Sequence, residues 1–380
     1  MKIGRIETFY VPPRWLFVRI ESDDGAVGWG EASLEGYAEA VDGAFEALRD
    51  RFTGHDPYRI EDIWQVAYRG GFYRGGPVLM SALAGLEQAL WDLKGKALGL
   101  PAWEMLGGAV RDRIRAYAWI GGDRPDEIGD AAEARRAQGF SAVKMNATAE
   151  MDWIGTPKLF DEVIARVQAA KEAGMDVGLD FHGRVHKPMA KQLLKVLEPL
   201  GLLFVEEPLL SENADSLAQI VGNCSIPIAL GERLFSRWDF KPVFEARAVD
   251  IIQPDLSHAG GILECRKIAA MAEAYDVAVA PHCPLGPLAL AACLQLAACT
   301  PNVAIQEMSL GIHYNTGGHD LLNFITNPEV LSPVEGYLPI PRGPGLGVTI
   351  DEAAVREADK DRHRWRNPIW RHKDGSFAEW

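Results

Sequence analysis

The sequence predicts a TIM-type barrel preceded by a separate α+β domain. Residues 1–110 contain strand patterns followed by helical patterns, which is typical of an α+β domain. Residues 111–319 instead alternate short apolar runs with helical stretches, the order expected of a parallel barrel. A chain of 380 residues is long enough for a barrel and a further domain.

The first domain begins with strands. Residues 1–32 alternate apolar and polar positions, as at Leu16, Val18 and Ile20, and a turn is expected at 22–25. Apolar side chains then recur at helical spacing, which predicts helices at 36–52, 57–68 and 77–98. The last helix is expected to stop near Gly99, because this glycine and the nearby Pro101 are typical of a helix end.

Eight apolar runs rich in Val, Ile and Ala are expected to form the barrel strands. Such runs are typical of strands that are buried on both faces of a parallel sheet. They span residues 113–120, 141–146, 176–182, 202–208, 226–232, 249–255, 277–283 and 303–309. Residues 320–380 have no such period, and they are predicted to form a return segment that packs on the first domain.

The charge balance excludes two classes of partner. Asp and Glu outnumber Lys and Arg by 53 to 39, giving a formal net charge of −14. Non-specific binding to nucleic acids or anionic membranes needs a basic surface, so we expect neither, and a small molecule is the expected partner. Five cysteines without a C-x-x-C pair, and an N-terminus without an apolar leader, favour a cytoplasmic protein.

Polar side chains end nearly every predicted barrel strand. In chain order they are Lys144, Asn146, Asp180, His182, Glu206, Glu207, Glu232, Asp255, His282 and Glu307. The carboxyl ends of barrel strands meet at one mouth, where active sites lie. These groups are therefore expected to converge there, and the repulsion between their carboxylates requires a compensating positive charge.

Asp180, Glu206 and Glu232 are candidate metal ligands on adjacent strands. Hard oxygen ligands suit Mg²⁺, or Mn²⁺, better than Zn²⁺. Each residue alone could instead cap the helix that follows its strand. Three such residues in succession favour the metal site.

These residues resemble the metal ligands of the enolase superfamily, which end the third, fourth and fifth barrel strands. The resemblance covers essentially the whole chain. It implies a (β/α)7β barrel, an N-terminal capping domain completed by the C-terminal segment, and a symmetric homo-oligomer. The pair His282 and Asp255 resembles the mandelate racemase subgroup. Residues 179–188 and 204–208 resemble the galactonate dehydratases of that subgroup, which implies D-galactonate as the substrate.

One departure from the subgroup favours a lyase. Its racemases carry Lys-x-Lys on the second barrel strand, and the second Lys is one of two opposed bases. Here the segment is Lys144-Met145-Asn146, and an amide cannot accept a proton. Racemisation needs a proton acceptor on each face, whereas elimination needs one base and one acid. Lys144 would instead help neutralise the substrate carboxylate, and Asn146 would hydrogen-bond a hydroxyl or carboxylate.

The resemblance implies the dehydration of a sugar acid to a 2-keto-3-deoxy acid. His282, oriented by Asp255, would take the C2 proton. His182 would protonate the departing C3 hydroxyl, and Glu307 would hydrogen-bond the enediolate oxygen. The metal would stabilise the negative charge that develops on the substrate.

Other interpretations stay open at this point. A racemase or epimerase could use His182 and His282 as its two bases, and another aldonic or aldaric acid could be the substrate. A non-catalytic metal-binding barrel is the alternative from a different class, although the complete set of acid, base and ligands argues against it. His282 could also be a rigid turn residue beside two prolines, and Lys144 a structural ion-pair partner.

Overall fold

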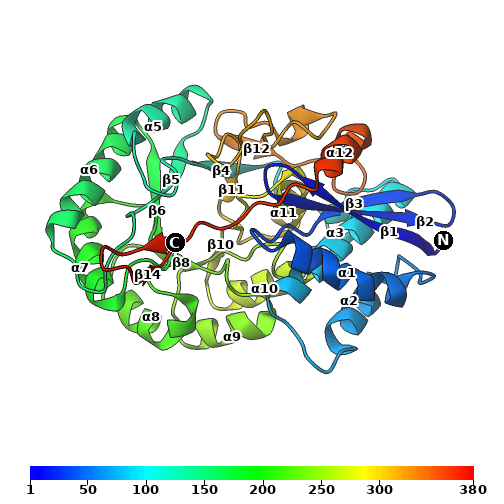
Figure 1. The fold of residues 1–380 in the computed structure, drawn as a ribbon, viewed down its shortest axis with the longest axis horizontal. Coiled ribbons are helices and arrows are strands. Elements are labelled where there is room, and N and C mark those ends of the chain that lie inside the picture. The colour runs from blue at the N-terminus through cyan, green and yellow to red at the C-terminus, as the bar shows by residue number, and fades with distance from the viewer.

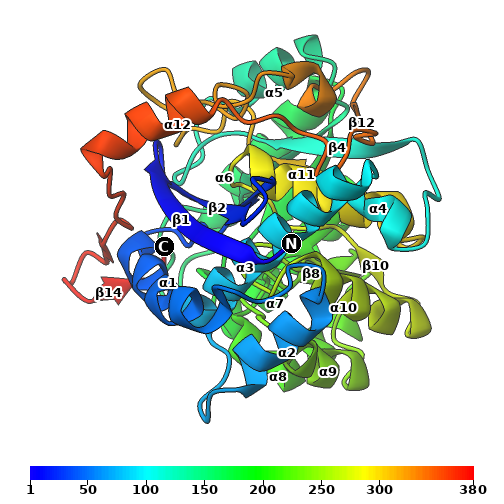
Figure 2. The ribbon, with the colours of Figure 1, turned by 90° about the vertical axis from the view of Figure 1, so that its right-hand side faces the viewer.

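The computed structural model describes residues 1–380, except for the side chain of Ala214. An antiparallel sheet and its helices, formed by the N-terminal part of the chain, lie beside a parallel barrel (Figure 1). The view turned by 90° places this N-terminal part in front of the barrel (Figure 2). The predicted fold class, a modified TIM barrel with an α+β domain before it, is confirmed.

The N-terminal part has the predicted order of strands followed by helices. Its sheet consists of β1 (Ile3–Val11), β2 (Trp15–Ser22) and β3 (Val27–Glu31), paired antiparallel in that order. Four helices follow: α1 (Ala38–Phe52), α2 (Ile60–Arg69), α3 (Pro77–Leu98) and α4 (Ala102–Met105). The sheet rests on α3 through glycines, because a Cβ at Gly30 would lie only 2.3 Å from the carbonyl oxygen of Gly85.

The barrel contains eight strands at the predicted places. They are β4 (Arg113–Trp119), β5 (Ala142–Asn146), β6 (Asp176–Asp180), β7 (Phe204–Glu206), β8 (Ile228–Leu230), β9 (Ile251–Ile252), β10 (Ala278–Val279) and β11 (Gln306–Met308). Neighbours in sequence pair in parallel from β4 to β10, and β11 pairs with β4. A parallel bridge between Val279 and Val303 joins the two remaining edges and closes the ring.

Seven helices surround this ring, one after each strand from β4 to β10. They are α5 (Ile128–Ala137), α6 (Lys158–Glu172), α7 (Lys187–Leu197), α8 (Ala214–Val221), α9 (Arg237–Glu245), α10 (Ile262–Ala274) and α11 (Pro287–Cys299). The C-terminal segment follows β11, so the barrel is of the (β/α)7β type. Among the described residues, no helix combines the length and the apolar composition that spanning a membrane requires.

The hydrogen-bonded strands are shorter than the predicted ones at their carboxyl ends. The strand expected at 249–255 is reduced to Ile251–Ile252, and the strand expected at 277–283 to Ala278–Val279. The residues beyond these strands leave the sheet and form the loops of the barrel mouth. Asp255 and His282 therefore sit on loops, which allows their side chains to reach one another across the mouth.

Two buried glutamates connect the N-terminal part to the barrel. The carboxylate of Glu31, at the end of β3, accepts hydrogen bonds from the first backbone N–H groups of α11. Glu87, on α3, does the same for Ile262 and Leu263 of α10, at 2.8 and 2.9 Å. Both side chains cap helix N-termini, where negative charge is favourable. Burial opposes this charge and raises the pKa of each carboxyl to about 7.

The C-terminal segment contacts both parts of the molecule. Its strand β12 (Tyr337–Pro339) pairs with β4, and α12 (Glu352–Ala358) lies beside β1. This segment also contains the short 3₁₀ turns η3 (Pro328–Leu331) and η4 (Asp359–Asp361). Two further 3₁₀ turns, η1 (Glu198–Leu200) and η2 (Ser211–Asn213), lie in the barrel. The chain then crosses to the barrel, where β13 (Trp370–Arg371) and β14 (Phe377–Ala378) form a hairpin (Figure 1, red).

Gly30→Ala tests the close approach of the sheet to α3. The new methyl group would meet backbone atoms of Gly85 and Ala89, so we expect a loss of about 1–3 kcal/mol of unfolding free energy. Gly43→Ala in α1 is the matched control, because its Cβ would point into open space. That change should stabilise the protein by about 0.5–1 kcal/mol. Thermal unfolding measures both, and equal midpoints for the two variants would contradict this packing.

Candidate active site

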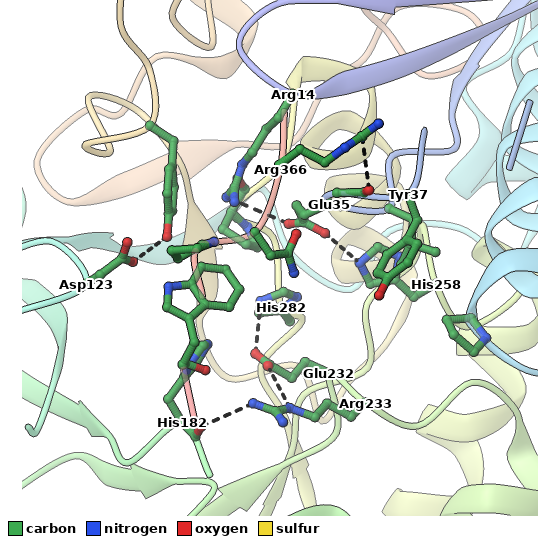
Figure 3. A pocket seen from close by; sticks show the side chains of 18 of the residues that line it. Arg14, Glu35, Tyr37, Asp123, His182, Glu232, Arg233, His258, His282 and Arg366 are labelled. Atoms are coloured by element: carbon green, nitrogen blue, oxygen red, sulfur yellow. Dashed lines mark hydrogen bonds and ion pairs between the residues drawn. The ribbon is translucent and has the colours of Figure 1, made fainter. Parts of the chain in front are cut away.

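A cavity of about 1060 Å³ opens at the carboxyl ends of the barrel strands. Side chains from the barrel, the N-terminal part and the C-terminal segment line it together (Figure 3). The predicted site residues that border it are Lys144, Asn146, Asp180, His182, Glu232 and His282. The structure therefore brings the strand-end residues of four different strands to one place.

Asp180, Glu206 and Glu232 form a compact group of carboxylates. Asp180 and Glu206 end β6 and β7, and Glu232 lies two residues beyond β8. One oxygen of each lies within 4.8 Å of the others. Among the described residues, Asp180 Oδ2 and Glu206 Oε1 are buried without a hydrogen-bond partner. An all-oxygen set with unsatisfied acceptors fits a divalent cation of the Mg²⁺ type.

Burial makes this concentration of negative charge costly. It raises the pKa of Asp180 well above its usual range, with a further contribution from Glu206, and that of Glu206 to about 7, with further contributions from Glu232 and Glu307. Glu207, the next residue, is also buried, and its pKa is raised to about 8 for the same reason. These buried carboxylates therefore need nearby positive charge to stay ionised.

Lys144 supplies part of that charge from within the barrel. Its Nζ atom lies 2.8 Å from Glu206 Oε2, 2.9 Å from Glu307 Oε1 and 3.7 Å from Asp180 Oδ2. Burial alone would lower the pKa of Lys144, but these carboxylates raise it well above its ordinary value. The ion-pair interpretation of Lys144 thus agrees with the contacts of its amine, and the residue also borders the cavity.

Asn146 and Glu307 are both engaged with the protein itself. The Asn146 amide donates to the carbonyl oxygens of Gly122 and Asp123, and its buried Oδ1 has no partner among the described residues. Glu307 is fully buried in β11, where Oε2 accepts from the Cys283 backbone N–H at 2.8 Å. This bond ties Glu307 to the loop that carries His282.

The pair His282 and Asp255 has the geometry expected from the sequence. Nδ1 of His282 lies 2.8 Å from Asp255 Oδ2, and the other oxygen of Asp255 accepts from the backbone N–H of Ser257. Nε2 of His282 lies 3.0 Å from Glu232 Oε2. Burial would lower the pKa of His282, but Glu232, Glu307 and Asp255 raise it well above its ordinary value.

His182 borders the cavity from a turn, although the strand was predicted to extend to residue 182. β6 ends at Asp180, and His182 sits in a turn with φ of +51°. Its backbone N–H donates to Asp180 Oδ1, and its Nδ1 lies 2.9 Å from a main-chain oxygen of Trp380. Burial, with help from nearby cations, lowers the pKa of His182 to about 3, so the ring is neutral near pH 7.

Several residues around the cavity were missed by sequence reasoning. Arg233 pairs with Glu207 at 3.1 Å and donates to the carbonyl oxygen of His182. It directly follows the predicted ligand Glu232, so its position in the sequence could have predicted a place at the barrel mouth. From the N-terminal part, Arg14 lies 3.7 Å from Glu35, which contacts His258 of the barrel at 3.5 Å (Figure 3).

These contacts across the two parts had no signal in the sequence. Arg14 belongs to a hairpin loop, and Glu35 to the segment before α1, far along the chain from the barrel. Burial opposes the charge of Glu35, yet Arg14 and His258 lower its pKa to about 2. The group therefore forms a charged wall on the side of the cavity that faces the N-terminal part.

Two family models match the chain, and together they cover most of it. Residues 11–107 match the N-terminal domain of mandelate racemase and muconate lactonizing enzyme. Residues 127–354 match the enolase C-terminal domain-like family.

Relatives and solved structures agree with these matches. D-galactonate dehydratases of Ralstonia pickettii (strain 12J) and Ralstonia nicotianae (strain ATCC BAA-1114 / GMI1000) are each 55% identical over the full length of both chains. An enolase from Agrobacterium radiobacter, crystallised with Na and L-malate, is 32% identical with a TM-score of 0.90 and full coverage of both chains. A mandelate racemase/muconate lactonizing enzyme-like protein from Roseovarius sp. TM1035 has a TM-score of 0.83 at 32% identity, covering 94% and 95% of the two chains.

A divalent cation should stabilise the protein through the three carboxylates. Added Mg²⁺ or Mn²⁺ should raise the unfolding temperature of chelator-treated protein, because a ligand at a hundred times its Kd contributes about 2.7 kcal/mol. Glu206→Gln should abolish this rise. Asp176→Asn is the matched control, since Asp176 begins the strand that Asp180 ends and pairs with Arg115. A rise that persists in Glu206→Gln would place the cation elsewhere.

Proposed function

The chain belongs to the enolase superfamily, and from this premise we propose that it is a Mg²⁺-dependent hydro-lyase that converts D-galactonate to 2-dehydro-3-deoxy-D-galactonate. The observation that carries the proposal is the convergence of two histidines, one paired with Asp255, on a cavity bordered by two of three clustered carboxylates. The full-length similarity to D-galactonate dehydratases supports the same reaction and substrate.

Asp180, Glu206 and Glu232 would hold the cation. When bound, Mg²⁺ would neutralise these carboxylates and stabilise the negative charge that develops on the substrate carboxylate during proton abstraction. The unsatisfied oxygens of Asp180 and Glu206 support this assignment. Their all-oxygen chemistry is the reason for choosing Mg²⁺, with Mn²⁺ able to substitute.

His282 would be the base that removes the C2 proton. A base must present an unprotonated nitrogen, and Nε2 is the candidate because Nδ1 faces Asp255. Nε2 now contacts Glu232, so this contact has to open and Nε2 has to be without a hydrogen before it can accept the C2 proton. Asp255 then holds the ring by its other nitrogen and stabilises the imidazolium that forms.

His182 would be the acid that assists loss of the C3 hydroxyl. The ring is neutral in the present arrangement, so the acid form requires the additional negative charge of a bound substrate. Lys144 would help neutralise the substrate carboxylate, and Glu307 would hydrogen-bond the enediolate oxygen. Asn146 would contribute hydrogen bonding through its unpaired Oδ1.

A racemase using His182 and His282 as two bases is the competing function within the same family. Asn146 stands where a second base would be needed, and its amide is bonded to backbone carbonyls. Formation of a 2-keto acid, detected with semicarbazide, distinguishes dehydration from inversion. We also propose a cytoplasmic location and assembly into a homo-oligomer. Light scattering after gel filtration measures the oligomeric state.

His282→Asn should remove both dehydration and exchange of the C2 hydrogen with solvent deuterium. An amide cannot accept the C2 proton, and His282 is not one of the proposed cation ligands. The cation-induced rise in unfolding temperature should therefore persist. His55→Asn, an exposed position outside the cavity, should retain wild-type turnover. Wild-type dehydration by His282→Asn would overturn this mechanism.

His182→Asn should separate loss of water from loss of a better leaving group. Hydroxide leaves poorly without a proton, so dehydration of D-galactonate should fall by about 10²–10⁴-fold. Fluoride needs far less protonation, so elimination from 3-deoxy-3-fluoro-galactonate should fall much less. Keto-acid formation and fluoride release are the two measurements. An equal loss on both substrates would show that His182 is not the leaving-group acid.

A further inference from the structure

We propose that the C-terminal strap, residues 363–380, completes the catalytic apparatus, with a main-chain oxygen of Trp380 positioning the imidazole of His182. The inference rests on the proposed role of His182 as the leaving-group acid. It concerns a residue that is far from the barrel strands in sequence. This oxygen would act on His182 as the Asp255 carboxylate acts on His282.

The strap is attached to the N-terminal part at its beginning. Arg366 donates to Glu39 of α1 at 3.1 Å and to the carbonyl oxygen of Gly36 at 3.3 Å. Arg364 adds a contact of 3.3 Å to the same glutamate. From here the chain crosses in front of the barrel to the hairpin of β13 and β14 (Figure 1). The strap therefore spans from the N-terminal part to the barrel.

A second attachment fixes the hairpin on the barrel. The ring of Trp370 is contacted by the guanidinium groups of Arg124 and Arg184, at 3.9 and 4.6 Å from its centre. Arg184 is almost completely buried, and its Nη1 donates to the carbonyl oxygens of Asp123 and Thr148 at 2.8 Å each. Cation–π contacts to such an immobile group favour one position of the hairpin.

These two attachments deliver Trp380 to the cavity wall. Its indole packs beside Trp365, with ring centres 5.9 Å apart, and meets the His182 ring edge-on at 5.7 Å and 87°. Pro368, Ile369, Phe377 and Glu379 of the strap also line the cavity. The strap is thus one wall of the candidate active site.

The contact between Trp380 and His182 has a definite chemical direction. This main-chain oxygen can only accept, so the 2.9 Å contact requires His182 Nδ1 to carry a hydrogen and donate it. Arg184 Nη2 is only a donor and would need the same nitrogen to accept, but it lies farther away, at 3.4 Å. With Nδ1 committed to the strap, Nε2 is the nitrogen left for the substrate. The hydrogen bond made by one ring nitrogen sets the state of the other.

This arrangement suits an acid that must give up one particular proton. During elimination, Nε2–H would donate its proton to the C3 oxygen, the C3–O bond would break, and water would leave. The electron pair released at C2 would form the C2–C3 double bond of the enol. His182 would then be left as the neutral Nδ1–H form, which is the form that the main-chain oxygen of Trp380 binds. The strap therefore orients the ring before and after the transfer.

The direct test is the ring state of His182 in protein labelled with ¹⁵N-histidine. Two-bond ¹H–¹⁵N spectra distinguish the Nδ1–H form from the Nε2–H form, and His182→Asn identifies the signals. We expect the Nδ1–H form in the full chain and its loss when residues from Glu379 onward are removed. Trp380→Gly, which keeps the main chain, should retain it. Lys373→Ala, on the exposed hairpin turn, should leave the spectrum unchanged.

Activity gives the second measurement. Removal from Glu379 onward should lower kcat for D-galactonate by about 10- to 100-fold, by analogy with the loss seen when a group that orients a metal-bound histidine is removed. Fluoride release from the 3-fluoro substrate and C2 exchange should fall much less. In Trp380→Gly, kcat for D-galactonate should fall less than in the truncated protein. A truncated protein that keeps the Nδ1–H form, or that loses water and fluoride elimination equally, would overturn the inference. Absence of dehydration by the wild-type protein would instead overturn the proposed function, while the ring state would still test the contact.

Discussion

The barrel mouth has to stabilise a concentration of carboxylates that are largely withdrawn from water. Asp180, Glu206, Glu207, Asp255 and Glu307 are all buried there, and Glu232 is nearly so. Moving an unpaired carboxylate out of water is costly, so each of them must have a positive or hydrogen-bonding partner. The other features of the site follow from this requirement.

The protein meets the requirement only in part with its own cations. Lys144 lies among Asp180, Glu206 and Glu307, Arg233 pairs with Glu207, and His282 contacts Glu232. Oxygens of Asp180 and Glu206 remain without hydrogen-bond partners among the described residues. The incomplete balance gives a divalent cation a large electrostatic advantage at this point. A cation held there would stabilise the negative charge that develops on a substrate.

Closure of the mouth depends on parts of the chain outside the barrel. Glu31 and Glu87 cap barrel helices and thereby hold the N-terminal part in place over the mouth. Arg14 and Glu35 then face the cavity from that side, and the strap that ends at Trp380 faces it from another. Enclosure of this kind strengthens electrostatic interactions inside the cavity, because less water is present to screen them. The barrel supplies the reacting groups, and the other two parts supply the walls.

The fold class and the meeting of the barrel strand ends at one mouth follow from the amino-acid sequence alone. Parallel strands buried on both faces leave a clear apolar period, and the topology of a closed barrel then brings to one mouth the strand ends that carry or precede Asp180, Glu206, Asp255 and His282. The family and the hydro-lyase activity were also predicted from these residues, and the matches to known proteins confirm them. Only the tertiary structure decided which atoms meet. The contact of His282 with Glu232, the turn that carries His182, and the arrival of Trp380 beside it depend on loops and on segments up to 198 residues apart. No local periodicity encodes such contacts, because they arise from packing between distant parts of the chain.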